Sequence, residues 1–381
     1  MSGKKTLKFK ILPAIFLAGF LFFNLINIRV FAFPLEKINC ELTVVALGKE
    51  YKFFYPEIDL NGSEPYLKNA AEVVDGIYLD TIVRPKDAKV QISPEKEYPF
   101  EFIKERQGKA IDKESLLISI EKALLVGNKK IVANEIPLSP SITVEKLRKS
   151  TYRRAFFTTG YAYSSEERKS NIRLCANLIG GVQLNPYQEF SFNQAVGERT
   201  EERGFKSAKV IEKGKFIDGI GGGVCQVSST LYNAVLLGGL KVTERHPHSM
   251  AVSYVEPSFD AMVSMGYADL KVVNNSNDIV FIVATAKENT VTVTVYGTKT
   301  QITYKRVSEV IEKIAPPEMV RTLSNEVDVG EERVLVYQKD GLISQGFLEI
   351  YNGDKLINTL KLSKDKYAPL QGELLYNDGT I

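Results

Sequence analysis

The sequence predicts a multi-domain α+β protein, with a central domain in which helices come first and an antiparallel sheet follows. At 381 residues, the chain is long enough for two to three domains. Two helical patterns end at Gly180-Gly181 and at Gly238-Gly239, and β-rich segments follow from about residue 250 to residue 296. Helices followed by a run of strands are typical of the α+β class.

An α+β N-terminal domain is expected over residues 41–145. Residues 41–47 and 87–92 have strand patterns, and residues 112–125 have the pattern of an amphipathic helix. The proline-bounded segment 137–140 is expected to be a linker to the next domain.

The central domain is expected over residues 150–300. Its first helix begins at Ser164, which stands three residues before Glu167 as in a capping box. Its second helix opens at Cys225, directly after a run of three glycines. The expected strands are residues 250–255, 260–265, 270–273, 279–285 and 290–296.

A small β-rich domain is expected over residues 305–381, where glycines interrupt short apolar runs such as residues 334–337.

Residues 1–33 have the features of a membrane anchor or a signal segment. Four lysines precede an uncharged, mostly apolar run from Ile11 to Ile28, which is long enough to span a bilayer. A cleaved signal and a retained anchor both remain open, and the length of the run favours an anchor. The lysines place the N-terminus in the cytoplasm and the rest of the chain on the extracytoplasmic face of the cell membrane, or in the medium if the segment is cleaved.

Charge and cysteine content exclude several classes of function. The first 32 residues hold five Lys and Arg and no Asp or Glu, so the formal net charge of +3 becomes −2 for the remainder. This near-neutral body gives no basis for nucleic-acid binding. Three cysteines without a CxxC pattern form no disulfide framework, and two histidines give no zinc spacing. We therefore expect no metal and no cofactor.

The glycine-cysteine run at residues 221–225 is the main candidate for chemistry. Cys225 is expected in the first turn of a helix, where free N–H groups favour a thiolate. The only two histidines of the chain, His246 and His248, follow within 23 positions. We expect His248 to take the thiol proton, whereas His246 is expected at the surface or behind the site.

The remaining catalytic and binding candidates follow from this placement. Asp260 or Asp269 would orient the imidazole of His248, each from a following strand. Gly222 and Gly223 would let the backbone approach a substrate closely. The amide of Cys225, with Gln226 nearby, would donate hydrogen bonds to an oxyanion.

The chain order of helix-borne Cys, then His, then Asp is that of transglutaminase-like hydrolases, and papain-like hydrolases also place Cys before His. This is a similarity of order alone. A structural interpretation remains open: Cys225 would lie in a tight turn into a core helix, as buried cysteines often do.

Two arginines are candidates for substrate binding. Arg199 and Arg245 have the fork geometry that binds a carboxylate through two hydrogen bonds. The alternative is that each is paired with a neighbouring acidic residue such as Glu198 or Glu244, and this alternative is favoured.

A series of motifs in the central region resembles the VanW domain. The resemblance covers roughly residues 150–280 and is carried by Phe190-Ser-Phe-Asn193, Gly197-Glu-Arg-Thr200, GGGVCQVSSTLYNA from Gly221, Glu244-Arg-His-Pro-His-Ser249, Asp260-Ala261 and Asp269-Leu-Lys-Val-Val-Asn-Asn275. Two turns depart from the family pattern. Pro186-Tyr187-Gln188 stands where relatives usually have Pro-Gly-Glu, and Pro257-Ser258-Phe259 precedes Asp260 where a glycine is common.

The flanks resemble domains that accompany VanW. Residues 41–145 are similar to a domain described as peptidoglycan-binding, through residues 99–103 and 108–112. The tail is more weakly similar to the wall-associated domain named for its five glycines.

The resemblance implies a cell-envelope protein of Gram-positive type whose partner is peptidoglycan or its stem peptides. Two functions stay open. One is cysteine-dependent acyl transfer or amide hydrolysis on these peptides. The other is a non-catalytic peptidoglycan-binding or scaffolding role.

Overall fold

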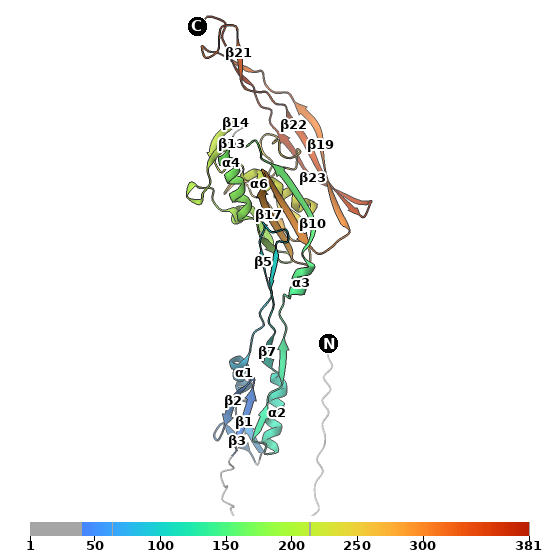
Figure 1. The fold of residues 1–381 in the computed structure, drawn as a ribbon. Helices are drawn as coiled ribbons and strands as arrows, with labels where there is room; N and C mark the ends of the chain where they lie inside the picture. The colour runs from blue at the N-terminus through green and yellow to red at the C-terminus, as the bar shows by residue number, and fades with distance from the viewer. Residues whose placement is uncertain (1–39, 63, 213–214, 381) are drawn as a thin grey trace, which may run out of the picture. The chain divides into compact units, whose positions relative to one another are not determined.

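The computed structural model describes residues 40–62, 64–212 and 215–380 (Figure 1). The chain is a mixed α/β protein with many strands, few helices and several separate sheets, which agrees with the expected class at this level. The expected anchor or signal segment, residues 1–33, lies outside the described residues. No helix within the described ranges is both long and apolar enough to cross a membrane.

Contacts divide the chain into two compact units. Of the described residues, the first contains those up to Asp80 together with Asp112–Asn134, and the second contains Thr81–Ile111 together with those from Glu135 onward. The expected N-terminal domain, residues 41–145, therefore has parts in both units, because residues 81–111 cluster with the second.

The first unit combines a small sheet with two helices. Strand β1 (Leu42–Ala46) pairs antiparallel with β2 (Lys49–Phe53) and parallel with β8 (Lys130–Val132). Strands β3 (Ile58–Asn61) and β4 (Glu64–Leu67) form a hairpin. The unit also holds α1 (Ala70–Thr81) and α2 (Lys113–Leu125). Asp112 caps α2 through a bond from Ser115 N. Helix α1 was not expected from the sequence.

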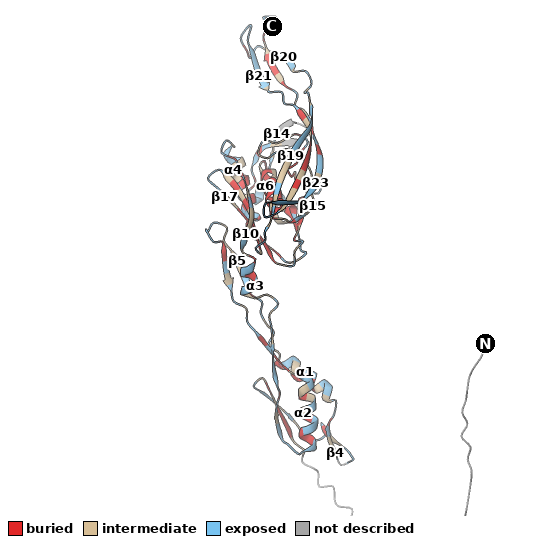
Figure 2. Ribbon diagram, turned by 90° about the vertical axis from the view of Figure 1, so that its right-hand side faces the viewer, coloured by how far each residue is buried: buried red, intermediate tan, exposed pale blue. Residues whose placement is uncertain are grey.

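A four-stranded antiparallel sheet forms the centre of the second unit. Its order is β10 (Tyr152–Gly160), β18 (Thr290–Gly297), β17 (Val280–Lys287) and β11 (Val182–Leu184). Alternate residues of β17 enter two different hydrophobic clusters, so both faces of this sheet are covered (Figure 2).

Two helices cover one face of the central sheet. Helix α4 (Glu166–Leu178) contacts β17, and α6 (Val224–Leu237) contacts β10 and β18. The other face packs against the hairpin of β5 (Lys89–Ile92) and β6 (Phe100–Ile103), where the rings of Phe100 and Phe281 are 5.0 Å apart.

Shorter elements surround this core. They are β7 (Gly108–Ile111) paired with β9 (Glu135–Leu138), α3 (Val144–Lys149), α5 (Phe192–Val196), the 3-10 helix η1 (Glu201–Arg203), the hairpin of β13 (Ser207–Glu212) and β14 (Lys215–Ile220), and the sheet of β12 (Glu189–Ser191), β16 (Lys271–Val273) and β15 (Lys241–Glu244). The segment 137–140, expected as a linker, therefore begins inside a strand.

The C-terminal part of the chain is built of strands. A three-stranded sheet contains β19 (Ile302–Ile314), β22 (Gly341–Asn352) and β23 (Lys355–Tyr367), and a second contains β20 (Val320–Leu323), β24 (Glu373–Tyr376) and β21 (Glu332–Val336). The first of these sheets packs on the core, because the Arg306 guanidinium of β19 lies 4.4 Å from the ring of Phe157 and 4.7 Å from that of Phe259.

Helix α6 is buried along nearly all of its length. Its apolar side chains join the main core, and Leu231 and Val235 are fully buried. Its polar side chains bond to neighbouring backbone, since Ser228 Oγ donates to Ala261 O and Asn233 Nδ2 to Phe259 O. A buried polar group without such a partner would destabilise the fold.

The strands expected at residues 250–255 and 260–265 are absent, and these predictions were wrong. The segment is an irregular loop with isolated bridges from His246 to Met262 and from Ser264 to Ala268. Side chains replace the strand ladder there, because Ser258 N donates to Tyr367 Oη and Ala261 N to Ser229 Oγ. The helix expected to start with Ser164 is capped one residue later, by Ser165.

The two turns that depart from the family pattern both contain a residue with positive φ. Tyr187 has φ of 61° and Ser258 has φ of 67°. Glycine adopts this conformation without a steric penalty, whereas another residue in it costs about 1–2 kcal/mol. At Ser258 the turn is held by the hydrogen bond to Tyr367 and by a bond to Ser344 Oγ at 2.6 Å.

Truncation of Leu231 tests the burial of α6. Leu231→Ala should lower the free energy of unfolding by about 2–5 kcal/mol, because the change removes fully buried methyl groups and leaves a cavity. Urea denaturation followed by circular dichroism measures this loss. Leu335→Ala, at a half-exposed position of β21, is the matched control and should change the stability by less than about 1 kcal/mol. Equal effects of the two substitutions would contradict the burial of α6.

Candidate active site

Cys225 lies in the first turn of α6. The helix begins at Val224, and Gly223 stands at its N-cap with φ of 107°. N–H groups of a first helical turn have no partner within the helix and favour a negative charge. The residue is partly exposed, and Sγ lies 3.6 Å from Val263 O. The residue as a whole is therefore not fully buried, although its side chain packs against the main core.

His248 and Asp260 form a buried pair beside this thiol. His248 Nδ1 is 2.6 Å from Asp260 Oδ2, and the same oxygen accepts a bond from the backbone N of His248 at 2.7 Å. The imidazole also interacts with the thiol of Cys225, and this interaction affects the pKa of both groups. Since Nδ1 is bonded to Asp260, Nε2 is the ring nitrogen left for the thiol. The structure thus brings Cys225, His248 and Asp260 together.

The electrostatics of this arrangement favour a thiolate beside an imidazolium. Burial raises the pKa of the Cys225 thiol, but the hydrogen bond and charge of His248 outweigh it, so this pKa falls below its ordinary value. Burial lowers the pKa of His248, yet bonds to Asp260 and Cys225 raise it to about 9. The pKa of Asp260 is lowered, because the bonds and charges of His248 and Arg245 outweigh its burial.

Asp260 is held by residues from distant parts of the chain. Arg245 Nη2 donates to Asp260 Oδ1 at 2.7 Å, and Arg245 Nε donates to Asp260 O at 2.6 Å. Tyr367 Oη donates to Asp260 Oδ1 at 2.6 Å. The other nitrogen of the guanidinium, Nη1, pairs with Asp365 Oδ2 at 2.7 Å. Arg245 is therefore a buried structural cation, and its partners are Asp260 and Asp365, not Glu244.

Arg199 and Arg168 both lie close enough to Cys225 to interact with it electrostatically. Among the described residues, neither arginine has a carboxylate partner within ion-pair distance. Arg199 Nη2 donates to Asn193 Oδ1 at 2.7 Å, whereas its Nη1 is buried with no hydrogen bond to the described residues. The ion pair expected between Arg199 and Glu198 does not form. Burial lowers the pKa of each guanidinium.

Tyr254 is a further neighbour of the thiol. Its side chain interacts electrostatically with Cys225, and burial raises its pKa well above the ordinary value. The loop that carries Tyr254 thus contributes to the surroundings of the thiol, although it does not form the expected strand.

The glycines before Cys225 are explained by backbone packing. A Cβ on Gly222 would lie 2.8 Å from Lys209 O, and a Cβ on Gly223 would lie 2.9 Å from Ile172 Cγ1. These contacts, together with the positive φ of Gly223, leave no room for a side chain.

The side chain of Gln226 forms its hydrogen bonds with residues of β10. Its Nε2 donates to Gly160 O at 2.8 Å and to Thr159 Oγ1 at 3.0 Å, and the residue is buried. Of the two expected oxyanion donors, the side chain of Gln226 is therefore engaged elsewhere, which leaves the backbone amide of Cys225.

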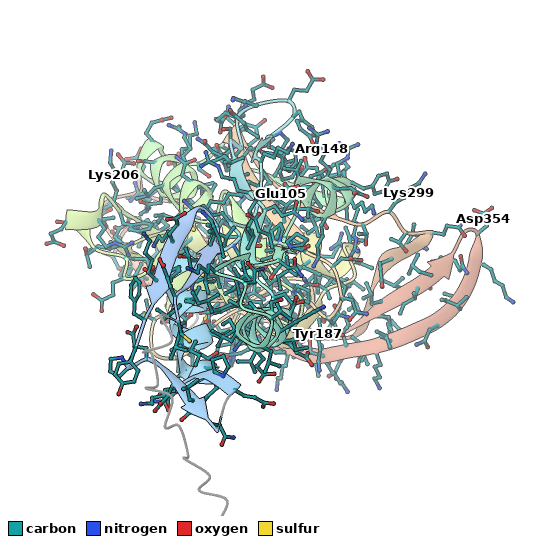
Figure 3. All side chains as sticks on the ribbon, turned by 90° about the horizontal axis from the view of Figure 1, so that it is seen from below. Glu105, Arg148, Tyr187, Lys206, Lys299 and Asp354 are labelled. Carbon is teal, nitrogen blue, oxygen red and sulfur yellow. The ribbon has the colours of Figure 1, made fainter. Side chains whose placement is uncertain are left out.

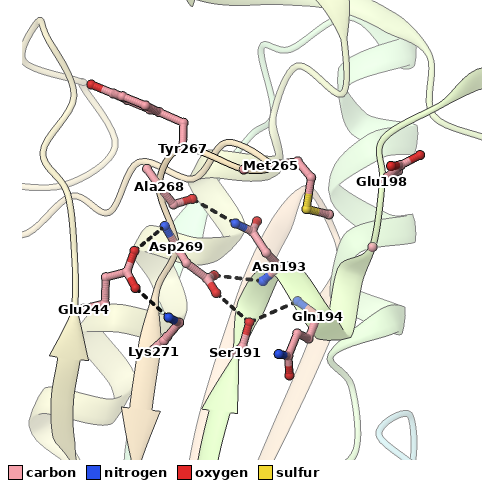
Figure 4. A pocket seen from close by; sticks show the side chains of 12 residues that line it. Ser191, Asn193, Gln194, Glu198, Glu244, Met265, Tyr267, Ala268, Asp269 and Lys271 are labelled. Carbon is pink, nitrogen blue, oxygen red and sulfur yellow. Dashed lines mark hydrogen bonds and ion pairs between the residues drawn. The ribbon is translucent and has the colours of Figure 1, made fainter.

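Asp269 lies in a different cluster and does not contact His248. Its carboxylate accepts bonds from Ser191 Oγ at 2.5 Å and from Asn193 N at 2.9 Å. These residues line a pocket of about 550 Å³ that also contains Glu244 and Lys271 (Figure 4). Of the two expected aspartates, the structure places only Asp260 beside the imidazole.

His246 also lies apart from the thiol. Its Nε2 is 3.1 Å from Glu244 Oε1, and its side chain is 40% exposed. Within the described parts of the chain, no group of three or more His, Cys, Asp or Glu side chains is arranged to hold a metal ion.

Two parts of the chain are similar to known protein families. Residues 167–296 match the family model described as "VanW like protein", and residues 66–133 match the one described as "Putative peptidoglycan binding domain". The chain is therefore similar to the VanW-like family over its central part and to the second family over the part before it.

Two curated relatives share this part of the sequence. The chain is 40% identical over 172 residues to the uncharacterized protein YoaR of Bacillus subtilis, covering 45% of this chain and 57% of the relative. It is 30% identical over 126 residues to the vancomycin B-type resistance protein VanW of Enterococcus faecalis, covering 31% and 46%. The matched part thus spans about half the length of each relative.

Solved structures of G5 domains match only a fifth of the chain. The crystal structure of HP0197-G5 has 17% sequence identity and a TM-score of 0.13, covering 20% of this chain and 96% of that one. The IgA1 protease G5 domain has 16% identity and a TM-score of 0.15, covering 21% and 93%.

The pH dependence of thiol alkylation tests the ion pair. For wild-type Cys225, the rate with iodoacetamide at pH 6 should exceed that of a free thiol and should rise less steeply toward pH 8, because the pKa of the thiol is lowered while His248, with a pKa of about 9, stays protonated. In His248→Ala, burial raises the pKa of the thiol, and the rate at pH 6 should fall at least about tenfold. Mass spectrometry of the labelled peptide measures both rates.

His246→Ala is the matched control, because His246 contacts Glu244 and not the thiol. It should leave the pH profile of Cys225 unchanged. A wild-type rate that rises about tenfold per pH unit, as for a free thiol, would contradict the thiolate–imidazolium pair.

Proposed function

We propose that the VanW-like domain carries out cysteine-dependent acyl transfer or amide hydrolysis on peptides of the cell wall. The observation that supports it is the line of three groups, Cys225, His248 and Asp260, at the start of a buried helix. This is the arrangement of nucleophile, base and orienting carboxylate that recurs on unrelated folds.

Each group has a role that its contacts define. The Cys225 thiolate attacks the carbonyl carbon of an amide, and the S–C bond forms as the carbonyl becomes an oxyanion. The backbone N–H of Cys225 is the donor available for this charge, because the N–H groups of Val224 and Gln226 are bonded to Gly221 O and Gly223 O. The C–N bond then breaks, and the imidazolium of His248 gives its Nε2 proton to the departing amine. A thioester on Cys225 remains.

The second half of the reaction regenerates the thiolate. Water or an amine attacks the thioester, His248 takes the proton of this nucleophile, and the S–C bond breaks. Hydrolysis results when the acceptor is water, and a new amide bond results when it is an amine. Asp260 keeps the proton of His248 on Nδ1 throughout and stabilises the imidazolium.

The wall polymer is the substrate and partner that the flanking domain suggests. Residues 66–133 match a family described by peptidoglycan binding, and both ends of this match, residues 66–80 and 112–133, lie in the first unit. We infer that the first unit holds the chain on peptidoglycan on the extracytoplasmic face of the membrane, while the VanW-like domain acts on stem peptides. A non-catalytic scaffold with the same binding unit is the alternative.

Trapping of the acyl-enzyme tests the catalytic proposal. The full-length chain, incubated with purified stem peptides and quenched in acid, should carry a peptide-derived mass on Cys225. Cys225→Ala should carry none, and Asp260→Asn should form the adduct about 10²- to 10⁴-fold more slowly. Cys40→Ser is the control that keeps the adduct. A wild-type protein that forms neither adduct nor product from any stem peptide, while it still binds the wall, would favour the scaffold.

Retention on isolated sacculi tests the binding proposal. The full-length chain and its Cys225→Ala variant should both sediment with sacculi at physiological salt, because binding by the first unit does not require the thiol. Digestion of the sacculi with a muramidase should release both. Absence of sedimentation in both proteins would remove peptidoglycan as the partner.

A further inference from the structure

A buried cluster of charges connects the C-terminal strand β23 to the candidate active site. Arg245 is paired with Asp260 and with Asp365, and each pair has an N–O distance of 2.7 Å. Only 5% of the Arg245 side chain, 1% of Asp260 and 4% of Asp365 are exposed. Charges in such surroundings are weakly screened, so each partner affects the others strongly.

The charges of this cluster balance only when His248 is protonated. One guanidinium faces two carboxylates, which leaves one negative charge. That charge matches the imidazolium of His248, whose Nδ1 lies on Asp260. Without the carboxylate of Asp365, the full charge of Arg245 would act on Asp260, and Asp260 would stabilise the imidazolium less.

The other ionisable groups around the cluster do not supply this balance. On α6, the Tyr232 ring lies 5.5 Å from the Arg245 guanidinium, and burial raises the pKa of its hydroxyl to about 12, so it is neutral. Tyr367 is also neutral and donates to Asp260. Arg168, Arg199 and Tyr254 interact with the thiol of Cys225.

We propose that Asp365 is a positioning residue of the active site: by pairing with Arg245, it leaves the negative charge of Asp260 to the imidazolium of His248. Asp365 touches no reacting atom and acts through Arg245 and Asp260. The inference rests on the proposed function of Cys225 and His248. It makes the C-terminal sheet part of the site, because Asp365 and Tyr367 both belong to β23.

Removal of the charge of Asp365 tests this role. In full-length Asp365→Asn, the apparent pKa of Cys225, measured from the pH dependence of iodoacetamide alkylation, should rise by about one unit or more, so the rate at low pH falls about tenfold. Asp354→Asn is the matched control, because Asp354 is exposed at the turn between β22 and β23 (Figure 3). The control should keep the wild-type profile.

A double variant separates charge balance from general disruption. Arg245→Gln combined with Asp365→Asn removes both charges of the pair and leaves Asp260 facing His248, so the apparent pKa should return to within about half a unit of the wild-type value. A merely structural role of Asp365 predicts a double variant at least as impaired as the single one. If the single variant does not fold, the comparison of the double variant with the wild type decides by itself between charge balance and a merely structural role of Asp365.

Two results would overturn the inference. One is a folded Asp365→Asn variant, with an unchanged melting temperature, whose alkylation profile equals that of the wild type. The other is a double variant whose pKa is shifted by a full unit or more. Failure of the proposed function would look different, because the wild-type thiol itself would then titrate as a free cysteine.

Discussion

The contact between His248 and Asp260 is the interaction on which the rest of the site depends. One carboxylate oxygen accepts from both the ring and the backbone of the same histidine. The ring is thereby fixed in place and in tautomer, and its other nitrogen is left for the interaction with Cys225. A buried carboxylate is costly unless its oxygens are fully bonded. Here Arg245 and Tyr367 occupy the second oxygen, so the charge is tolerated.

The three groups are supplied by two kinds of structure, a helix and an irregular loop. The thiol stands at the end of a rigid helix whose glycine N-cap has no room for a side chain. The imidazole and the carboxylate lie in an irregular loop, whose backbone groups are bonded to side chains of α6 and of the C-terminal sheet. A loop held in this way gives the site a fixed geometry without a regular strand. The negative charge remains on Asp260 because the guanidinium beside it is shared.

Much of the core could be predicted from the sequence, and the site only in part. Helix α6 and strands β16, β17 and β18 follow from local periodicity and glycine positions. The expected strands at residues 250–255 and 260–265 are absent, because side chains far away in the sequence bond the backbone that strand partners would have bonded. Apolar alternation carries no information about such partners.

In the candidate site, too, local sequence patterns predict some residues, whereas residues that are distant in the chain cannot be predicted from them. Cys225 and His248 stand out by spacing and scarcity, and Asp260 by its place after them. From the sequence, Asp269 was as good a candidate as Asp260 for orienting the imidazole. In the structure, its carboxylate accepts hydrogen bonds from Ser191 Oγ and Asn193 N instead. Asp365 and Tyr367 could not be found, since they lie more than 100 residues beyond Asp260 in a segment with no motif. Only the position of β23 in the folded protein shows that these two residues belong to the site.

The position of β23 late in the chain has a consequence for biosynthesis. A polypeptide leaves the ribosome from its amino end, so the nucleophile and the imidazole are made long before Asp365 and Tyr367. A nascent chain that stops short of β23 has the thiol but lacks the groups that anchor and balance Asp260. Full reactivity of the cysteine therefore arises only when the tail has been synthesised and has folded back. In a truncated product, the thiol of Cys225 would react more slowly than in a chain that includes β23.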